Sequence, residues 1–145
     1  MIVALDTDVL VHWLMKGSPL HARSKSFVRG HLQANSTNRI GLCPQVIHEF
    51  LHVSTDPRRF EFPLEMTGAL ELARRLWNTA ETHRILPAPQ VVHRTLELMR
   101  LYGLGRKRIL DTALAAALES DGVNHLASFN QRDFVLFDFL VVLTP

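Results

Sequence analysis

The chain has 145 residues, of which 47% are hydrophobic and 21% charged, and a formal net charge of +2, which is typical of one globular domain spanning residues 1–145. No apolar run approaches the ~20 residues that cross a bilayer, and the start of the chain lacks the basic and apolar regions of a signal peptide, so we expect no membrane partner. A single cysteine, Cys43, excludes an internal disulfide and is typical of a reducing compartment, which predicts cytoplasmic localisation.

Short apolar segments alternate with amphipathic segments along the first half of the chain. The pattern predicts a buried strand over residues 1–5, which leads into a helix from about residue 7 to near residue 17. A second helix is expected over 21–34 and a short strand over 39–42. Pro44 suits the first turn of a helix that runs to about residue 55, where Asp56-Pro57 ends it.

The second half repeats this alternation. Pro63 is expected to open a long helix through residue 77, a strand is expected over 84–86, and a helix follows to about residue 102. A glycine-containing loop precedes a strong alanine-rich helix over 109–120, which Gly122 caps. Further strands are expected over 125–128 and 141–143. Alternating strands and helices predict an α/β sandwich around a short, mainly parallel central sheet.

In such folds, ligands bind outside the carboxyl ends of the strands, and acidic or amide residues fall at that edge. Asp6 directly follows the first strand, where its ordinary role would be to cap a helix. Asp111 lies in the first turn of a helix that is apolar nearly all round, where an unpaired carboxylate is costly. Asn130 and Asp133 follow the strand over 125–128, where their ordinary role would be that of turn residues. Glu49 borders the apolar stripe of its helix, where a glutamate is ordinarily a solvated side chain.

Carboxylates that converge on one place repel one another, so an ionised cluster is stable only with a cation between its members. Oxygen ligands favour hard ions such as Mg²⁺ or Mn²⁺ over zinc. The chemistry that follows is the attack of a metal-activated water on a phosphodiester. These positions therefore predict a hydrolase that acts on a nucleic acid.

Four motifs in this order resemble those of the PIN-domain ribonucleases. They are residues 5–10 (LDTDVL), 47–50 (IHEF), 111–117 (DTALAAA) and 128–134 (SFNQRDF), which together span nearly the whole chain. In its size, the chain resembles the proteins of the VapC branch of this family, which are the toxins of type II toxin–antitoxin systems. This resemblance implies an endoribonuclease that is inhibited by a VapB-like antitoxin and forms a homodimer. The apolar residues in excess on the first helix would form part of the dimer surface.

The resemblance also implies roles for individual residues. Asp6, Glu49 and Asp111 would be the metal-binding carboxylates. Asn130 occupies the place that many relatives fill with aspartate. Asp133 would then either take over the role of that aspartate or contact the metal ligands without binding the metal itself. Whether one metal ion or two would bind stays open.

Asp8 stands where asparagine is frequent in the family. Helical spacing aligns it with His12 and Lys16 on a polar stripe, so we expect that it does not bind the metal directly.

Two alternatives remain open. Residues 48–52 (HEFLH) match the H-E-x-x-H pattern of zinc peptidases, in which His48 and His52 would bind zinc and Glu49 would act as the base. A distant Glu71 is the one candidate for a third ligand, and the extended forms of the pattern are missing. A catalytically degenerate PIN domain that binds RNA or protein is the second alternative, because of Asn130.

Basic residues supply candidate RNA contacts. Thirteen arginines against three lysines favour a phosphate-binding partner, although a biased genome would produce the same excess. Arg106, Lys107 and Arg108 lie just before Asp111, so we expect them to bind RNA phosphates without reading sequence. The pairs Arg58-Arg59 and Arg74-Arg75 are expected to be surface charge or antitoxin contacts.

Overall fold

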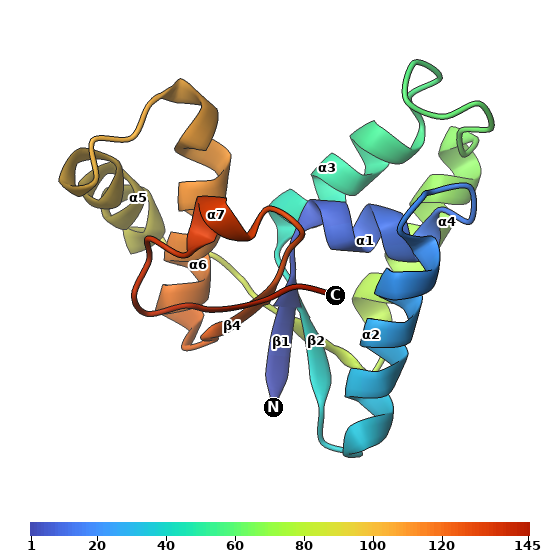
Figure 1. Cartoon of the computed structure of the whole chain (residues 1–145), viewed down its shortest axis with the longest axis horizontal. Helices are drawn as coiled ribbons and strands as arrows, with labels where there is room; N and C mark the ends of the chain where they lie inside the picture. The colour runs from blue at the N-terminus through green and yellow to red at the C-terminus, as the bar shows by residue number, and fades with distance from the viewer.

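Five parallel strands form the centre of the molecule, in the order β3-β2-β1-β4-β5, in a computed structural model that describes all 145 residues (Figure 1). Every neighbouring pair is parallel, so all the carboxyl ends meet at one edge of the sheet. The strands are β1 (Ile2–Leu5), β2 (Arg39–Leu42), β3 (Thr82–Arg84), β4 (His125–Ala127) and β5 (Val141–Leu143). This arrangement confirms the expected α/β sandwich with its parallel sheet.

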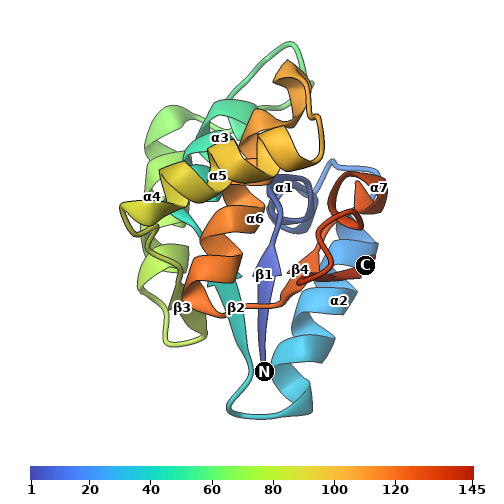
Figure 2. The ribbon, with the colours of Figure 1, turned by 90° about the vertical axis from the view of Figure 1, so that its left-hand side faces the viewer.

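Helices cover both faces of the sheet. Figures 1 and 2 show α5 and α6 on one side of the strands and α1 and α2 on the other, and α3 packs against both α1 and α4. The helices are α1 (Thr7–Leu14), α2 (His21–Ala34), α3 (Pro44–Ser54), α4 (Met66–Asn78), α5 (Gln90–Leu101), α6 (Ile109–Asp121) and α7 (Gln131–Phe134), with a 3₁₀ turn, η1 (Arg106–Arg108), before α6. None of them combines the length and the apolar character that a bilayer crossing requires.

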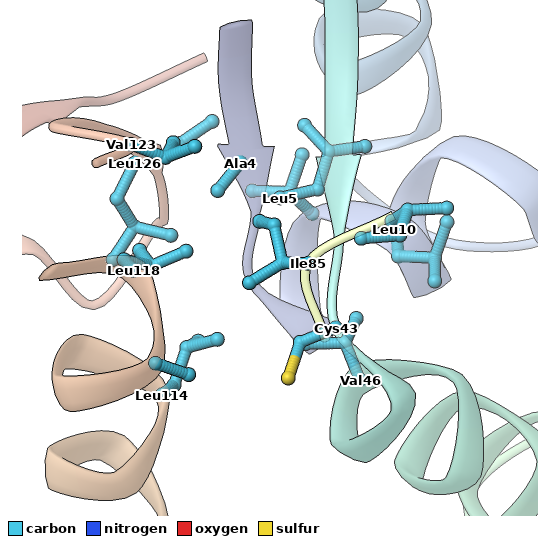
Figure 3. Packing of buried hydrophobic residues seen from close by; sticks show 14 of the residues in the cluster. Ala4, Leu5, Leu10, Cys43, Val46, Ile85, Leu114, Leu118, Val123 and Leu126 are labelled. Atoms are coloured by element: carbon cyan, nitrogen blue, oxygen red, sulfur yellow. The ribbon is translucent and has the colours of Figure 1, made fainter. Parts of the chain in front are cut away.

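The core surrounds β1, whose residues Val3, Ala4 and Leu5 are buried on both faces of the sheet. Figure 3 shows Leu114 and Leu118 of α6 on one side of β1 and Leu10 of α1 on the other. Because apolar burial of this kind is the main stabilising force in folding, this packing fixes β1 between α1 and α6. The end of β1 is therefore a firm platform for the residues that follow it.

Most expected elements are confirmed, several to the residue. The helix over 21–34 and the strands over 39–42 and 141–143 have the expected bounds. Gly122 ends α6 in the left-handed conformation, with φ of 76°, as a helix-capping glycine should.

Other boundaries differ for local reasons. Helix α1 ends at Leu14, because Met15 is already extended. Helix α4 begins at Met66 instead of Pro63, because the N–H of Leu64 donates to the carbonyl of Ser54 and holds this stretch extended. Strand β3 begins at Thr82, two residues before the expected strand over 84–86, where the Thr82 hydroxyl donates to the Leu76 carbonyl at 2.7 Å.

The apolar excess of the first helix, which was expected to serve a homodimer, is largely used within this chain. Val9, Leu10 and Val11 of α1 are buried in its core. Exposed apolar side chains lie on other elements, among them α5, where Leu96 and Leu101 are 63% and 67% exposed. The homodimer itself stays a prediction.

Candidate active site

A pocket of about 380 Å³ opens beyond the carboxyl ends of β1 and β4, and four of the expected site residues line it. They come from four separate stretches of the chain and are Asp6, Glu49, Asp111 and Asn130. The pocket is also lined by Thr7, Asp8, His52, Val53, Arg59 and Leu110. The parallel sheet therefore brings the predicted polar residues together at the edge where ligands bind in folds of this kind.

Asp6 lies at the base of the pocket, between β1 and α1. It caps α1, because its Oδ1 accepts a hydrogen bond from the N–H of Thr7 at 2.7 Å, and Oδ2 accepts one from the hydroxyl of Ser128 at 2.7 Å. Burial, and then the negative charge of Asp8, raise the pKa of this carboxyl group to about 7. The capping role expected of an isolated aspartate is real, but a cap alone does not account for a carboxylate that is only 8% exposed.

Asp8 also faces the pocket and does not lie on a solvent-facing polar stripe. Its Oδ2 accepts a hydrogen bond from the N–H of Phe129 at 3.1 Å, so the loop after β4 draws the side chain inward. The other oxygen, Oδ1, is buried and has no hydrogen-bond partner. Burial raises the pKa of Asp8 to about 6.

Glu49 projects from α3 and is held at both oxygens. Its Oε2 accepts a hydrogen bond from the Thr7 hydroxyl at 2.8 Å, and its Oε1 accepts one from the Gln45 amide at 3.1 Å. The same amide nitrogen donates to the carbonyl of Leu110 at 3.0 Å. Gln45 therefore ties α3 to the start of α6 and fixes Glu49 relative to Asp111.

Asp111 lies in the first turn of α6, beside Arg108. Its Oδ2 is 3.5 Å from Nε of Arg108, while Nη1 of Arg108 is 3.6 Å from Oδ1 of Asp133. Burial, followed by the negative charge of Asp133, raises the pKa of Asp111. Arg108 is turned toward these acids with its side chain only 21% exposed, so the expectation that it binds RNA phosphate together with Arg106 and Lys107 has no support in its position. Arg106 and Lys107 are exposed on η1.

Asn130 and Asp133 have different positions. Asn130 lines the pocket, and its N–H donates to the Ser128 hydroxyl that binds Asp6, at 3.0 Å. Asp133 does not line the pocket and reaches Asp111 only through Arg108. Of these two residues, only Asn130 lines the pocket, and its role at the fourth position stays a prediction.

The pocket fits a hydrated divalent ion better than a bare one. No three His, Cys, Asp or Glu side chains lie close enough together to hold an ion directly. Mg²⁺ commonly keeps several waters and uses only one or two carboxylates, which this spacing and volume allow. The raised pKa values of Asp6 and Asp111 show that burial and neighbouring acids disfavour their ionised forms, and a bound cation would favour those forms.

The structure does not provide the ligands that a zinc peptidase site would need. A catalytic zinc ion needs three protein side chains, and no such group surrounds His48 and His52, both of which are exposed. Glu71 is occupied by Arg74 and Arg75 of its own helix, at 2.9 and 2.8 Å. His52 shares the carboxylate pocket, whereas His48 lines a separate groove between α3 and α4.

Sequence reasoning missed four residues at this site: Thr7, Gln45, Ser128 and Arg59. Gln45 is detectable from its spacing, because residues four apart on a helix are neighbours and it precedes Glu49 by four. The roles of Thr7 and Ser128 depend on contacts between distant stretches of chain, which no local pattern reveals. Arg59 lines the pocket together with residues that are distant from it in the sequence.

Comparison with known proteins shows what the whole chain is similar to. The family model for the PIN domain matches residues 3–140. Ribonuclease VapC24 of Mycobacterium tuberculosis is 24% identical over 144 residues, which cover 99% of this chain and 97% of the relative.

Two solved structures have the same fold. The crystal structure of Mycobacterium tuberculosis VapC20, described as a sarcin–ricin loop cleaving toxin, matches with a TM-score of 0.73 and 14% identity over the whole of both chains. A toxin–antitoxin complex from Klebsiella pneumoniae matches with a TM-score of 0.61 and 18% identity, over 96% of this chain and 95% of that one.

Proposed function

Because the chain belongs to the PIN-domain family and is a distant homologue of the VapC ribonucleases, we propose that it is an endoribonuclease that depends on Mg²⁺ or Mn²⁺. The observation that carries this proposal is the convergence of Asp6, Asp8, Glu49 and Asp111 on one pocket. Four carboxylates that line one pocket repel one another when they are ionised, a bound cation would offset this repulsion, and a hard ion held by oxygen ligands is suited to phosphodiester hydrolysis.

In this proposal, Asp6, Glu49 and Asp111 would hold the ion, with at most two of them bound to it directly and the rest through its water molecules. The ion would supply a positive charge for the phosphate and make a water molecule more acidic. Thr7 and Gln45 fix both oxygens of Glu49, and Ser128 fixes Asp6, so the ligands are positioned before RNA binds. Asp8 lines the same pocket and is the candidate group to accept a proton from the attacking water. Asn130 presents a neutral side chain to the same pocket.

We further propose that the protein is the toxin of a pair with a VapB-like antitoxin. Support comes from the VapC relatives and from the toxin–antitoxin complex that shares the fold. Arg106 and Lys107, exposed on η1 next to the start of α6, remain candidate contacts to RNA phosphates.

Removal and return of metal tests the enzymatic proposal. Purified protein is expected to cleave RNA with added Mg²⁺ or Mn²⁺, to lose this activity in excess EDTA, and to regain it when divalent metal is restored. Cleavage that persists after complete chelation would contradict the mechanism. Salt-dependent RNA binding without cleavage under any metal condition would identify a degenerate PIN domain that acts as a binding module instead.

A further inference from the structure

Arg59 reaches the candidate active site from the stretch of chain between α3 and α4. It lines the same pocket as Asp6, Glu49 and Asp111, while its neighbour Arg58 does not. The sequence treats the two arginines alike, as a basic pair on the surface. The structure therefore distinguishes the two arginines, because only Arg59 lies at the candidate active site.

Asp56 explains why the two side chains behave differently. Arg58 donates hydrogen bonds to both carboxylate oxygens of Asp56. Its backbone N–H donates to Oδ1 at 2.9 Å, its Nε donates to Oδ1 at 3.1 Å, and its Nη2 donates to Oδ2 at 3.1 Å. The guanidinium of Arg59 comes no nearer to the carboxylate of Asp56 than 3.9 Å, which is beyond hydrogen-bond distance, and its side chain is 61% exposed. The guanidinium of Arg59 therefore keeps its donors available.

The pocket acids do not neutralise Arg59 either. No ion pair within 4.0 Å joins Arg59 to any acid other than Asp56, so it is an uncommitted cation at an acidic pocket. A guanidinium fork matches the oxygens of a phosphate, and it contacts the backbone of a nucleic acid without reading its bases. The pocket carboxylates repel an approaching anion such as a phosphate unless nearby cations offset their negative charge. Arg59 supplies such a positive charge at the edge of the pocket.

The position of Arg59 complements the basic turn on the other side of the pocket. Figure 1 shows the chain between α3 and α4 on the right of the molecule and the chain between α5 and α6, which carries Arg106 and Lys107, at the upper left. The pocket residues from α1, α3 and α6 lie between these two segments. A single strand of RNA that crosses the pocket would meet a cation on each flank.

We propose that Arg59 binds an RNA phosphate next to the cleaved bond, on the opposite side of the pocket from Arg106 and Lys107. This inference rests on the proposed ribonuclease function. It assigns Arg59 to substrate binding, in place of the surface or antitoxin role that its sequence suggests.

The test compares Arg59→Gln with two controls that remove the same charge, Arg58→Gln next to it and Arg100→Gln on α5, which is exposed and outside the pocket. Binding of a short single-stranded RNA of mixed sequence is measured by fluorescence anisotropy in EDTA over a range of salt concentrations. Arg59→Gln is expected to weaken binding about tenfold and to reduce the slope of log K against log salt by about 0.7, the value for one phosphate contact on a single strand. Arg59→Lys should keep the slope but recover only part of the affinity, because it keeps the charge and loses the fork.

Cleavage assays provide the second readout. With metal present, Arg59→Gln is expected to raise KM with a smaller change in kcat, and the two controls are expected to behave as wild type. Equal affinity and equal salt slope in Arg59→Gln and the controls would overturn the proposal, as would a loss of antitoxin binding alone. If wild type cleaves RNA but Arg59→Gln is unchanged, only the role of Arg59 fails; if wild type neither binds nor cleaves RNA, the proposed function fails with it.

Discussion

Replacement of Asp6 by asparagine is expected to reduce RNA cleavage by about 10²-fold or more without loss of the fold. Asparagine has nearly the same shape and can still accept the hydrogen bond from the N–H of Thr7, so α1 keeps its cap. The substitution removes a negative charge from the base of the pocket, and with it a ligand that the divalent ion needs. Gel-based cleavage of RNA in Mg²⁺ measures the effect, and expression of the variant in cells should no longer arrest growth.

The same substitution is expected to make the metal-free protein more stable. Burial and Asp8 oppose the ionisation of Asp6, so a neutral side chain there relieves an unfavourable charge. Urea unfolding in EDTA should therefore show a higher free energy of unfolding for Asp6→Asn than for wild type. Asp138→Asn removes an exposed carboxylate outside the pocket and should change neither activity nor stability. A variant of Asp6 that cleaves RNA as fast as wild type would remove Asp6 from the mechanism.

Stabilisation by Mg²⁺ is expected to be large near about pH 8 and nearly absent near about pH 5. The pKa of Asp6 is about 7 in the folded protein, above its ordinary value of 3.8. As pH rises between these values, the unfolded chain loses its proton first, so the metal-free protein becomes less stable, by an amount on the order of a few kcal/mol. A divalent ion binds the ionised carboxylates of the folded state and reverses this loss.

Urea unfolding in EDTA and in Mg²⁺ across this pH range measures both effects. In EDTA the free energy of unfolding should fall as pH rises, and the difference between Mg²⁺ and EDTA should grow over the same range. Asp6→Asn should flatten much of the pH dependence, because it has no proton to lose at this position. A Mg²⁺ effect that is independent of pH would show that the ion does not bind these carboxylates.

The sequence could predict the main acidic residues because each follows from a local pattern. Asp6 directly follows an apolar strand, and Asp111 begins an apolar helix, so both are placed by rules that hold for one element at a time. A parallel sheet then brings them together without further information. The same holds for Gly122, whose role depends on its own backbone conformation.

The missed features depend on contacts between elements. Helical spacing alone put Asp8 on a solvent-facing stripe, but the N–H of Phe129, from a loop 121 residues away in the sequence, turns its carboxylate into the pocket. Arg108 differs from Arg106 and Lys107 because Asp133 on α7 contacts it, and no helix was expected over the residues of α7. Local patterns predict which residues are available, whereas tertiary contacts decide which of them act together.

Titration of Mn²⁺ into the metal-free protein by calorimetry tests most directly whether the pocket carboxylates share a divalent ion. We expect wild type and Asp138→Asn to bind Mn²⁺ alike, with heat that disappears in Asp6→Asn and weakens in Glu49→Gln and Asp111→Asn. Equal Mn²⁺ affinity in wild type and all three pocket variants would contradict the account, because the ion would then bind elsewhere or not at all.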